Sequence, residues 1–174
     1  MLLNEELDKQ LYSAYWHKLQ QAKYDLIYYD IHFNCCTTVI RRIKYTTIGV
    51  TALATGAWIS WNAVPNIGTI CAILIWLVQV ISALSEKFPY EGRKLELREM
   101  ITELEPLYIQ MESDWRMVQS LKMSNQGISE AILRYDQKQA DIKRHYFKDD
   151  ALPEREKIKT KADNLTEEYF KFFV

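Results

Sequence analysis

The sequence predicts an all-α membrane protein in which a two-span transmembrane helical hairpin is flanked by long cytoplasmic helices. The first observation is that the 22 Lys and Arg and the 23 Asp and Glu all lie outside the segment from Tyr45 to Ser85. This charge-free segment of 41 residues is about twice the ~20 residues that a helix needs to cross a bilayer. The second observation is that apolar residues recur at steps of three and four on both sides of the segment, which is typical of helices, whereas no long segment alternates with period two.

Residues 1–44 are predicted to form an N-terminal cytoplasmic amphipathic helix. Their apolar positions make a narrow seam at 7, 11, 15, 19, 22, 26, 29, 33, 36, 40 and 43. No Pro or Gly occurs before Gly49, so this helix is expected to continue straight into the hairpin. Tyr15 and Tyr29 in the seam favour packing against other helices over a strict two-stranded coiled coil.

The hairpin is predicted to comprise transmembrane helix 1 at residues 45–64, an external turn at 65–68 and transmembrane helix 2 at 69–88. Pro65 and Gly68 mark the turn, because both residues interrupt helices. Basic residues flank the hairpin on both sides, and the positive-inside rule therefore places both termini in the cytoplasm. The expected location is the inner (plasma) membrane, with two passes. A soluble hairpin buried in a larger core is the weaker alternative, since the remaining 133 residues are so polar.

Residues 89–174 are predicted to form a C-terminal cytoplasmic helical region. Its first helix places apolar residues at helical spacing at Leu97, Ile101, Leu104, Tyr108, Met111, Trp115 and Val118. Pro106 is expected to bend or restart this helix. A turn is expected at 124–127, followed by a helix that Ser129 caps and that reaches about Tyr146. Pro153 fits the first turn of a closing helix.

Polar side chains within the hairpin are the candidate functional residues. The pore-lining candidates are Thr47, Thr51, Thr55, Asn62 and Gln79, of which the threonines recur every four residues. The alternative is structural, with the threonine hydroxyls bonded to their own helix and Gln79 joining helices. A neighbouring stripe of small residues provides the helix-packing candidates Gly49, Ala52, Gly56 and Ser60. Two spans cannot enclose a pore, so conduction would require self-assembly.

The sequence shows no arrangement of residues typical of an enzyme, a metal site or a cofactor site. Asp141 and His145 are four residues apart on a helix, but no further ligands complete a metal site. The five glycines form no phosphate-binding loop, and a net charge of −1 provides no field for nucleic acid. The three cysteines form no disulfide framework. We therefore expect a non-enzymatic protein with no cofactor, no metal and no nucleic-acid partner.

The order of these parts resembles the SLATT family (SMODS and SLOG-associating two-transmembrane effectors) over nearly the full chain. The likeness begins with a helix that contains Trp16, Lys18, Ala22 and Lys23, and the hairpin follows. The remaining parts are a helix with Arg93, Leu97, Ile101, Leu104 and Leu107, an acidic-basic helix from Lys138 to Tyr146, and a Pro-led helix that ends at about Phe173. The resemblance brings no catalytic motif.

The resemblance implies an oligomeric pore-forming or membrane-disrupting effector of a prokaryotic anti-phage (abortive infection) or nucleotide-signalling conflict system. Its expected partners are the lipid bilayer, further copies of the chain, and a separate soluble sensor protein or a nucleotide second messenger. The alternative function is a non-conducting, membrane-anchored scaffold that docks a soluble partner. A selective cation channel is less favoured, because the turn offers Asn62 and Asn66 rather than carboxylates.

Overall fold

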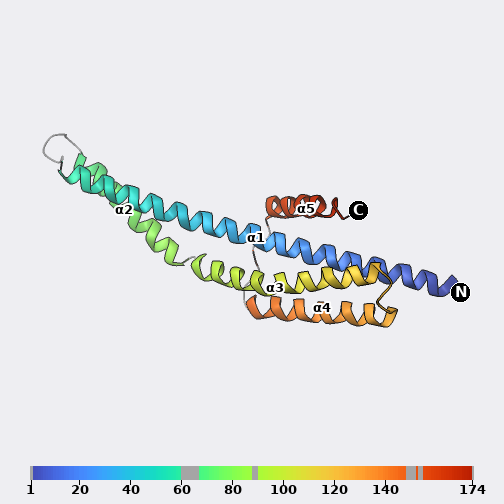
Figure 1. Cartoon of the computed structure of the whole chain (residues 1–174). Coiled ribbons are helices and arrows are strands. Elements are labelled where there is room, and N and C mark those ends of the chain that lie inside the picture. Colours follow the sequence, from blue (N-terminus) through green and yellow to red (C-terminus); the bar gives the residue numbers. More distant parts are fainter. Residues whose placement is uncertain (1, 60–66, 88–89, 148–151, 153–154, 174) are drawn as a thin grey trace. The chain divides into compact units, whose positions relative to one another are not determined.

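The protein is described here by a computed structural model that covers residues 2–59, 67–87, 90–147, 152 and 155–173. These ranges contain five helices and no strand, which confirms the all-α part of the predicted fold class. The helices are α1 (Leu2–Ile59), α2 (Ile67–Lys87), α3 (Tyr90–Gln119), α4 (Asn125–Tyr146) and α5 (Glu156–Phe170) (Figure 1). They form two compact units. Unit 1 comprises Met1–Phe33 and Glu96–Val174, and unit 2 comprises Asn34–Leu95.

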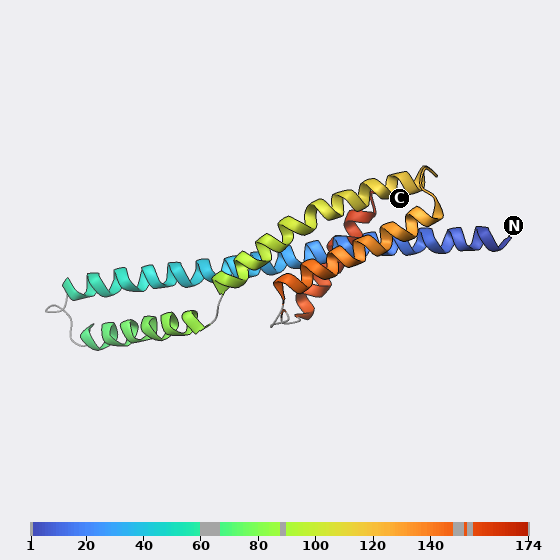
Figure 2. The same ribbon diagram turned by 90° about the horizontal axis from the view of Figure 1, so that it is seen from below.

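Unit 1 is a helical bundle in which the first half of α1 packs against α3, α4 and α5 (Figures 1 and 2). The predicted seam of α1 is its buried face, because Tyr15, Leu19 and Ala22 are almost fully buried and Tyr29 is 8% exposed. Each of the other helices turns one apolar face toward this seam, as expected of amphipathic helices around a shared core. The buried residues that they supply include Leu97, Met100, Leu104, Met111 and Val118 of α3, Ile128, Ala131 and Tyr135 of α4, and Ile158, Ala162 and Phe170 of α5.

Aromatic rings and their polar groups occupy the centre of the unit 1 core. The Tyr15 ring stacks on Trp115 with centroids 5.8 Å apart and meets Tyr135 edge-on at 6.5 Å. The Tyr15 hydroxyl donates a hydrogen bond to the Met111 carbonyl oxygen at 3.0 Å, and the Tyr135 hydroxyl donates to Asp114 Oδ2 at 2.6 Å. Buried polar groups stabilise a fold only when they are hydrogen-bonded, and these pairs meet that condition.

The structure corrects two local predictions for the C-terminal region, since Pro106 does not restart the helix and Ser129 does not cap the next one. Pro106 lies inside α3 without ending it, because Leu104, Leu107 and Tyr108 around it are buried in the same core, and this packing offsets the lost helical hydrogen bond. The cap of α4 is Ser124 rather than Ser129: its side-chain oxygen accepts a hydrogen bond from the backbone N–H of Gly127 at 3.2 Å. Pro153 lies outside the described residues.

The turn before α4 contains a residue in the left-handed backbone region. Leu121 has a φ of 55°, and the Lys122 N–H donates to the Met117 carbonyl oxygen at 3.0 Å. This pattern ends a helix and usually places glycine at the left-handed position. Leucine there is strained, and its side chain is exposed. The turn reverses the chain so that α4 runs back alongside α3.

Unit 2 is a helical hairpin made by the second half of α1, α2 and the start of α3 (Figure 2). The N-terminal helix continues into the hairpin, as the absence of Pro and Gly before Gly49 predicted, since α1 runs without interruption from Leu2 to Ile59. Residues 65 and 66 of the predicted turn at 65–68 lie outside the described residues, and Ile67 and Gly68 already belong to α2. The described part of the predicted hairpin consists of the second half of α1 and of α2.

The membrane part of the predicted fold class is wrong. Across the residues that the structure describes, no helix combines the length and the apolar character needed to cross a bilayer. In α1, the charged residues Arg41, Arg42 and Lys44 lie directly before the apolar side chains that the structure describes in the second half of the helix.

Candidate functional site

Large apolar side chains of unit 2 are exposed, and together they form what we call the hairpin surface. On α2, Ile70, Ile73 and Trp76 are 56%, 54% and 61% exposed. The hairpin surface is defined by the exposed apolar residues Tyr45, Ile48, Leu53, Ile70, Ile73, Ile75, Trp76 and Leu77. Extended apolar patches of this kind mark sites of interaction rather than ordinary surface.

The structure places the predicted polar residues on the same two helices. The Thr47 hydroxyl donates to the Ile43 carbonyl oxygen at 3.0 Å, and the Thr51 hydroxyl donates to the Thr47 carbonyl oxygen at 2.8 Å. These two threonines therefore lie together on one edge of α1 and bond to their own helix, as the structural alternative expected. Gln79 is exposed on α2. The side chains of Thr55 and Asn62 lie outside the described residues, and a pore-lining role for the set stays a prediction.

The small-residue stripe of α1 is uncovered where the structure describes it. Gly49 and Ala52 are both exposed, and a Cβ atom added at Gly49 would meet no atom within 4 Å. Gly49 and Ala52 are small and exposed, so they leave room for another helix to approach α1 closely. The surroundings of Gly56 and the placement of Ser60 lie outside the description. A helix-packing role for all four residues stays a prediction.

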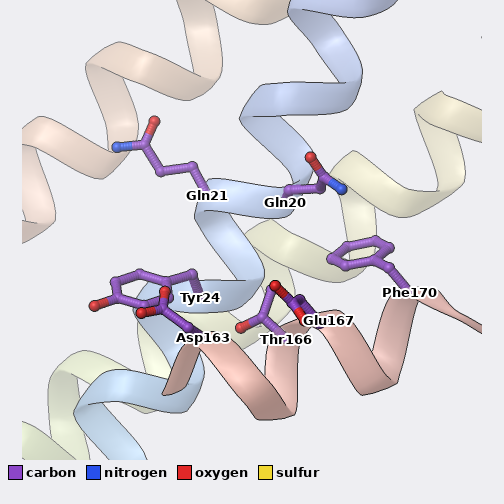
Figure 3. Close-up of a pocket in the computed structure, with 7 residues that line it drawn as sticks. All are labelled: Gln20, Gln21, Tyr24, Asp163, Thr166, Glu167 and Phe170. Atoms are coloured by element: carbon purple, nitrogen blue, oxygen red, sulfur yellow. The ribbon is translucent and has the colours of Figure 1, made fainter. Parts of the chain in front are cut away.

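A groove between α1 and α5 of unit 1 is a second candidate site. It has a volume of about 570 Å³, and the residues that line it are Gln20, Gln21 and Tyr24 of α1 and Asp163, Thr166, Glu167 and Phe170 of α5 (Figure 3). We call it the α1–α5 groove. Asp163, Glu167 and Phe170 are four and seven residues apart on α5, so helical geometry places them on one face. The groove depends on which helix α5 packs against, and no motif in the sequence marks it.

The α1–α5 groove carries negative charge and no positive charge on its lining. Asp163 and Glu167 supply the two carboxylates, and none of the seven lining residues is basic. Burial, followed by the neighbouring Asp163 carboxylate, raises the pKa of the Tyr24 hydroxyl above its ordinary value. The hydroxyl of Tyr24 therefore stays protonated at neutral pH and can donate a hydrogen bond.

A lysine holds α5 against α1 and α3 next to this groove. The Nζ atom of Lys23 lies 3.8 Å from the centroid of the Tyr169 ring and 4.9 Å from that of Tyr108. Burial lowers the pKa of Lys23, whereas the charges of Glu112 and Glu105 raise it. This arrangement is a cation–π contact, which stabilises the position of α5 on the bundle.

An ion pair between Asp25 and Lys143 joins α1 to α4 at a distance of 2.6 Å. The Asp25 side chain is 14% exposed, and its burial raises the pKa of Asp25 above the ordinary value of 3.8, although the Lys143 ammonium acts in the opposite direction. The folded state therefore holds the Asp25 proton more tightly than the unfolded state does. By linkage, the contribution of Asp25 to stability is greatest below pH 3.8 and declines as the pH rises through the raised pKa.

We expect this linkage to be visible in the Asp25→Asn variant, whose side chain does not titrate. The unfolding free energy of the native protein relative to that of the variant should fall as the pH rises from about 4, and it should level off above the raised pKa. Urea unfolding of both proteins at intervals from pH 4 to pH 7 measures this difference. A difference that is constant or that rises over this range would contradict the assignment.

The described residues contain no cluster of three or more histidine, cysteine or acidic side chains that could hold a metal ion. Asp141 forms an ion pair of 3.8 Å with Arg144, and the His145 ring packs edge-on against Tyr146. His32 is buried, with its ring 4.7 Å from that of Tyr28. These contacts account for the side chains as parts of the helical packing.

No protein-family model, curated protein or solved structure matches this chain. The resemblance to the SLATT family therefore stays a prediction from the sequence. The two features that the structure itself presents for interaction are the hairpin surface of unit 2 and the α1–α5 groove of unit 1.

Proposed function

We propose that the protein is a non-enzymatic helical scaffold that self-associates through its hairpin surface. One observation carries this proposal: α2 exposes bulky apolar side chains on most of its circumference, including Ile70, Ile73 and Trp76. A helix that is apolar all round is normally buried inside a larger body. Covering the hairpin surface would remove this apolar area from water at a gain of roughly 25 cal/mol per Å².

A second copy of the chain suits the hairpin surface because no charged side chain occurs from Tyr45 to Ser85. Two identical surfaces can therefore meet without bringing like charges together. Interface cores are depleted in charged residues and enriched in aromatic ones, and Trp76 fits this composition. The exposed Gly49 and Ala52 on α1 offer a shallow place for a bulky α2 side chain, such as Ile73, of the other copy.

Self-association through unit 2 would leave unit 1 to bind a soluble partner. Binding a soluble partner is the part of the predicted scaffold function that does not depend on a membrane. The core of unit 1 is well packed, and its buried Asp114 is paired with Tyr135 and Arg134. A bundle with a shared core leaves the outer faces of its helices for a partner. The pore-forming or membrane-disrupting effector function stays a prediction from family resemblance alone.

The oligomeric state of the full chain tests the proposal. We expect sedimentation equilibrium over a range of concentrations to show an oligomer, and we expect Ile73→Lys to raise its dissociation constant at least tenfold. The physical reason is that a lysine charge would be buried without a partner in an apolar interface. Because Ile73 is exposed in a single chain, the substitution should leave the helical circular dichroism spectrum unchanged.

The matched control is Leu133→Lys, which changes an exposed leucine of α4 in unit 1. Its dissociation constant should equal that of the native protein. Equal weakening by both substitutions would show that net charge, rather than the hairpin surface, controls association. A chain that stays monomeric at every concentration, whether or not it co-floats with lipid vesicles, would overturn the proposal and assign the hairpin surface to another occupant.

A further inference from the structure

The exposed side of α2 carries a regular seam of its own. Within unit 2, the covered side of α2 includes the buried Cys71 and the half-buried Leu74, Val78 and Ile81. On the opposite side of the helix, Trp76 is 61% exposed. We call the seam around Trp76 the outer seam, and its members, all exposed, are Thr69, Ala72, Trp76, Gln79 and Ala83. They are spaced by three, four, three and four residues, which is the repeat with which two helices pack along their length.

The residues of the outer seam differ in size and in polarity. Trp76 is bulky, whereas Ala72 and Ala83 are small. Thr69 and Gln79 are the two polar members, and each side chain can both donate and accept a hydrogen bond. A polar group that becomes buried in an apolar interface needs a hydrogen-bond partner. The surface that covers the outer seam must therefore offer space for the indole ring and a partner for the amide.

A second copy of α2 that runs in the opposite direction meets both requirements. In a symmetric antiparallel pair, residues equally far along the chain from the two-fold axis lie opposite each other. With the axis at the level of Leu74, Trp76 lies opposite Ala72 of the other copy, and Gln79 lies opposite Thr69 of the other copy. A large side chain then meets a small one in each of these layers, and the amide meets a hydroxyl.

Other arrangements of two copies fill the seam less well. In a parallel pair each residue meets itself, so two Trp76 rings share one layer and two Ala72 methyl groups share another. The indole rings would hold the helices apart and leave the alanine layer unfilled, whereas protein contacts are closely packed. Moving the antiparallel register by one layer places Ala72 opposite Ala83 and leaves a similar gap.

We propose that two copies of the chain associate through the outer seam as an antiparallel pair centred on Leu74, and that hydrogen bonds between Gln79 and Thr69 of the two copies determine this register. A single buried polar contact is known to fix the register of paired helices, because every other register leaves the polar group without a partner. This inference rests on the proposed self-association and adds the surface and the direction of the contact.

Replacing Thr69 with valine separates this arrangement from a general apolar attraction. Valine has nearly the shape of threonine and is more apolar, so an unspecific apolar surface would associate more tightly. In the proposed register, the substitution leaves the Gln79 amide of the other copy buried without a partner. We expect the dissociation constant from sedimentation equilibrium to rise roughly tenfold. It should return to within about threefold of the native value in Thr69→Val with Gln79→Leu, since replacing both polar partners is nearly neutral.

The matched control is Thr102→Val, which changes an exposed threonine of α3 whose hydroxyl donates to the Arg98 carbonyl oxygen of its own helix. Its dissociation constant should equal that of the native protein. Thr69 and Gln79 are exposed in a single chain, so their variants should keep the native circular dichroism spectrum. Unchanged or tighter association of Thr69→Val would overturn the inference.

Cross-linking between copies tests the direction of the pairing. Thr69→Cys and Gln79→Cys are introduced separately into a chain whose Cys35, Cys36 and Cys71 are replaced by alanine, and one of the two chains carries an affinity tag. A short bismaleimide linker should join position 69 of one chain to position 79 of the other when the chains are mixed. Neither chain alone should be cross-linked. Cross-links in either chain alone, or none in the mixture, would contradict the antiparallel register.

These measurements distinguish a failure of the register from a failure of self-association. A native chain that is monomeric at every concentration would overturn both proposals. Association that Ile73→Lys weakens, together with cross-links between two copies of position 69, would overturn the register alone.

Discussion

Replacing Tyr15 with alanine is expected to destabilise unit 1 by about 3–5 kcal/mol, the range for removing a large aromatic side chain from a core. Tyr15 is fully buried, and its ring contacts Trp115 of α3 and Tyr135 of α4. The substitution would therefore leave a cavity at the point where three helices meet. Urea unfolding followed by circular dichroism measures the loss, which should appear as a lower midpoint.

Tyr15→Phe separates the hydroxyl from the ring. This variant keeps the aromatic contacts and loses only the hydrogen bond to the Met111 carbonyl oxygen. Its expected cost is about 0.5–1.5 kcal/mol, the net value of one hydrogen bond. If Tyr15→Phe were as damaging as Tyr15→Ala, the hydrogen bond rather than the ring packing would hold the helices together. If neither variant lost stability, Tyr15 would not be a core residue.

The periodicity of the sequence predicts the core of unit 1 well. Tyr15, Leu19 and Ala22 stand in the predicted seam of α1, and the structure buries all three. On α3, the predicted positions Leu97, Leu104 and Val118 are buried too. A helix is held in a bundle by burying one apolar stripe. In the sequence, such a stripe is visible as apolar residues spaced three and four positions apart.

The sequence does not predict which helices meet. Lys23 of α1 lies on the Tyr169 ring of α5, and no local pattern relates residues so far apart in the chain. The α1–α5 groove results from that pairing, so neither its existence nor its lining could be found from the sequence. The one available signal was the spacing of Asp163, Glu167 and Phe170 on one helical face, which is equally typical of a solvated surface.

For the apolar hairpin, the sequence predicts that the helices are covered but does not predict what covers them. A long run without charge predicts that its helices are covered, and the exposure of Ile73 and Trp76 in a single chain agrees with that need. The pattern does not identify the cover, since an apolar helix satisfies the same requirement in a bilayer or in a protein assembly. The predicted membrane spans followed from choosing the first of these, which the described helices do not support.

Replacing Lys143 with methionine is expected to destabilise the protein by about 2–4 kcal/mol, because it leaves the Asp25 carboxylate buried without its partner. The lower part of this range applies because the Lys143 side chain is 33% exposed, so solvent screens part of the loss. Without the ammonium, the pKa of Asp25 should rise further, and the loss should be smaller in acid than at neutral pH. Urea unfolding at pH 5 and pH 7 measures both effects.

The double variant Asp25→Leu with Lys143→Met distinguishes two cases. Either the ion pair adds net stability to the fold, or its loss is costly only because one buried charge is left without a partner. Breaking a buried ion pair is costly, whereas replacing both partners with apolar residues is often neutral. We therefore expect the double variant to recover most of the stability that Lys143→Met loses. Additive losses from the two single substitutions would instead mean that each side chain acts through separate contacts, since coupling is what a shared interaction produces. In that case α1 and α4 would be joined by packing around Tyr29 and Phe147, whose rings lie 5.8 Å apart, rather than by the ion pair.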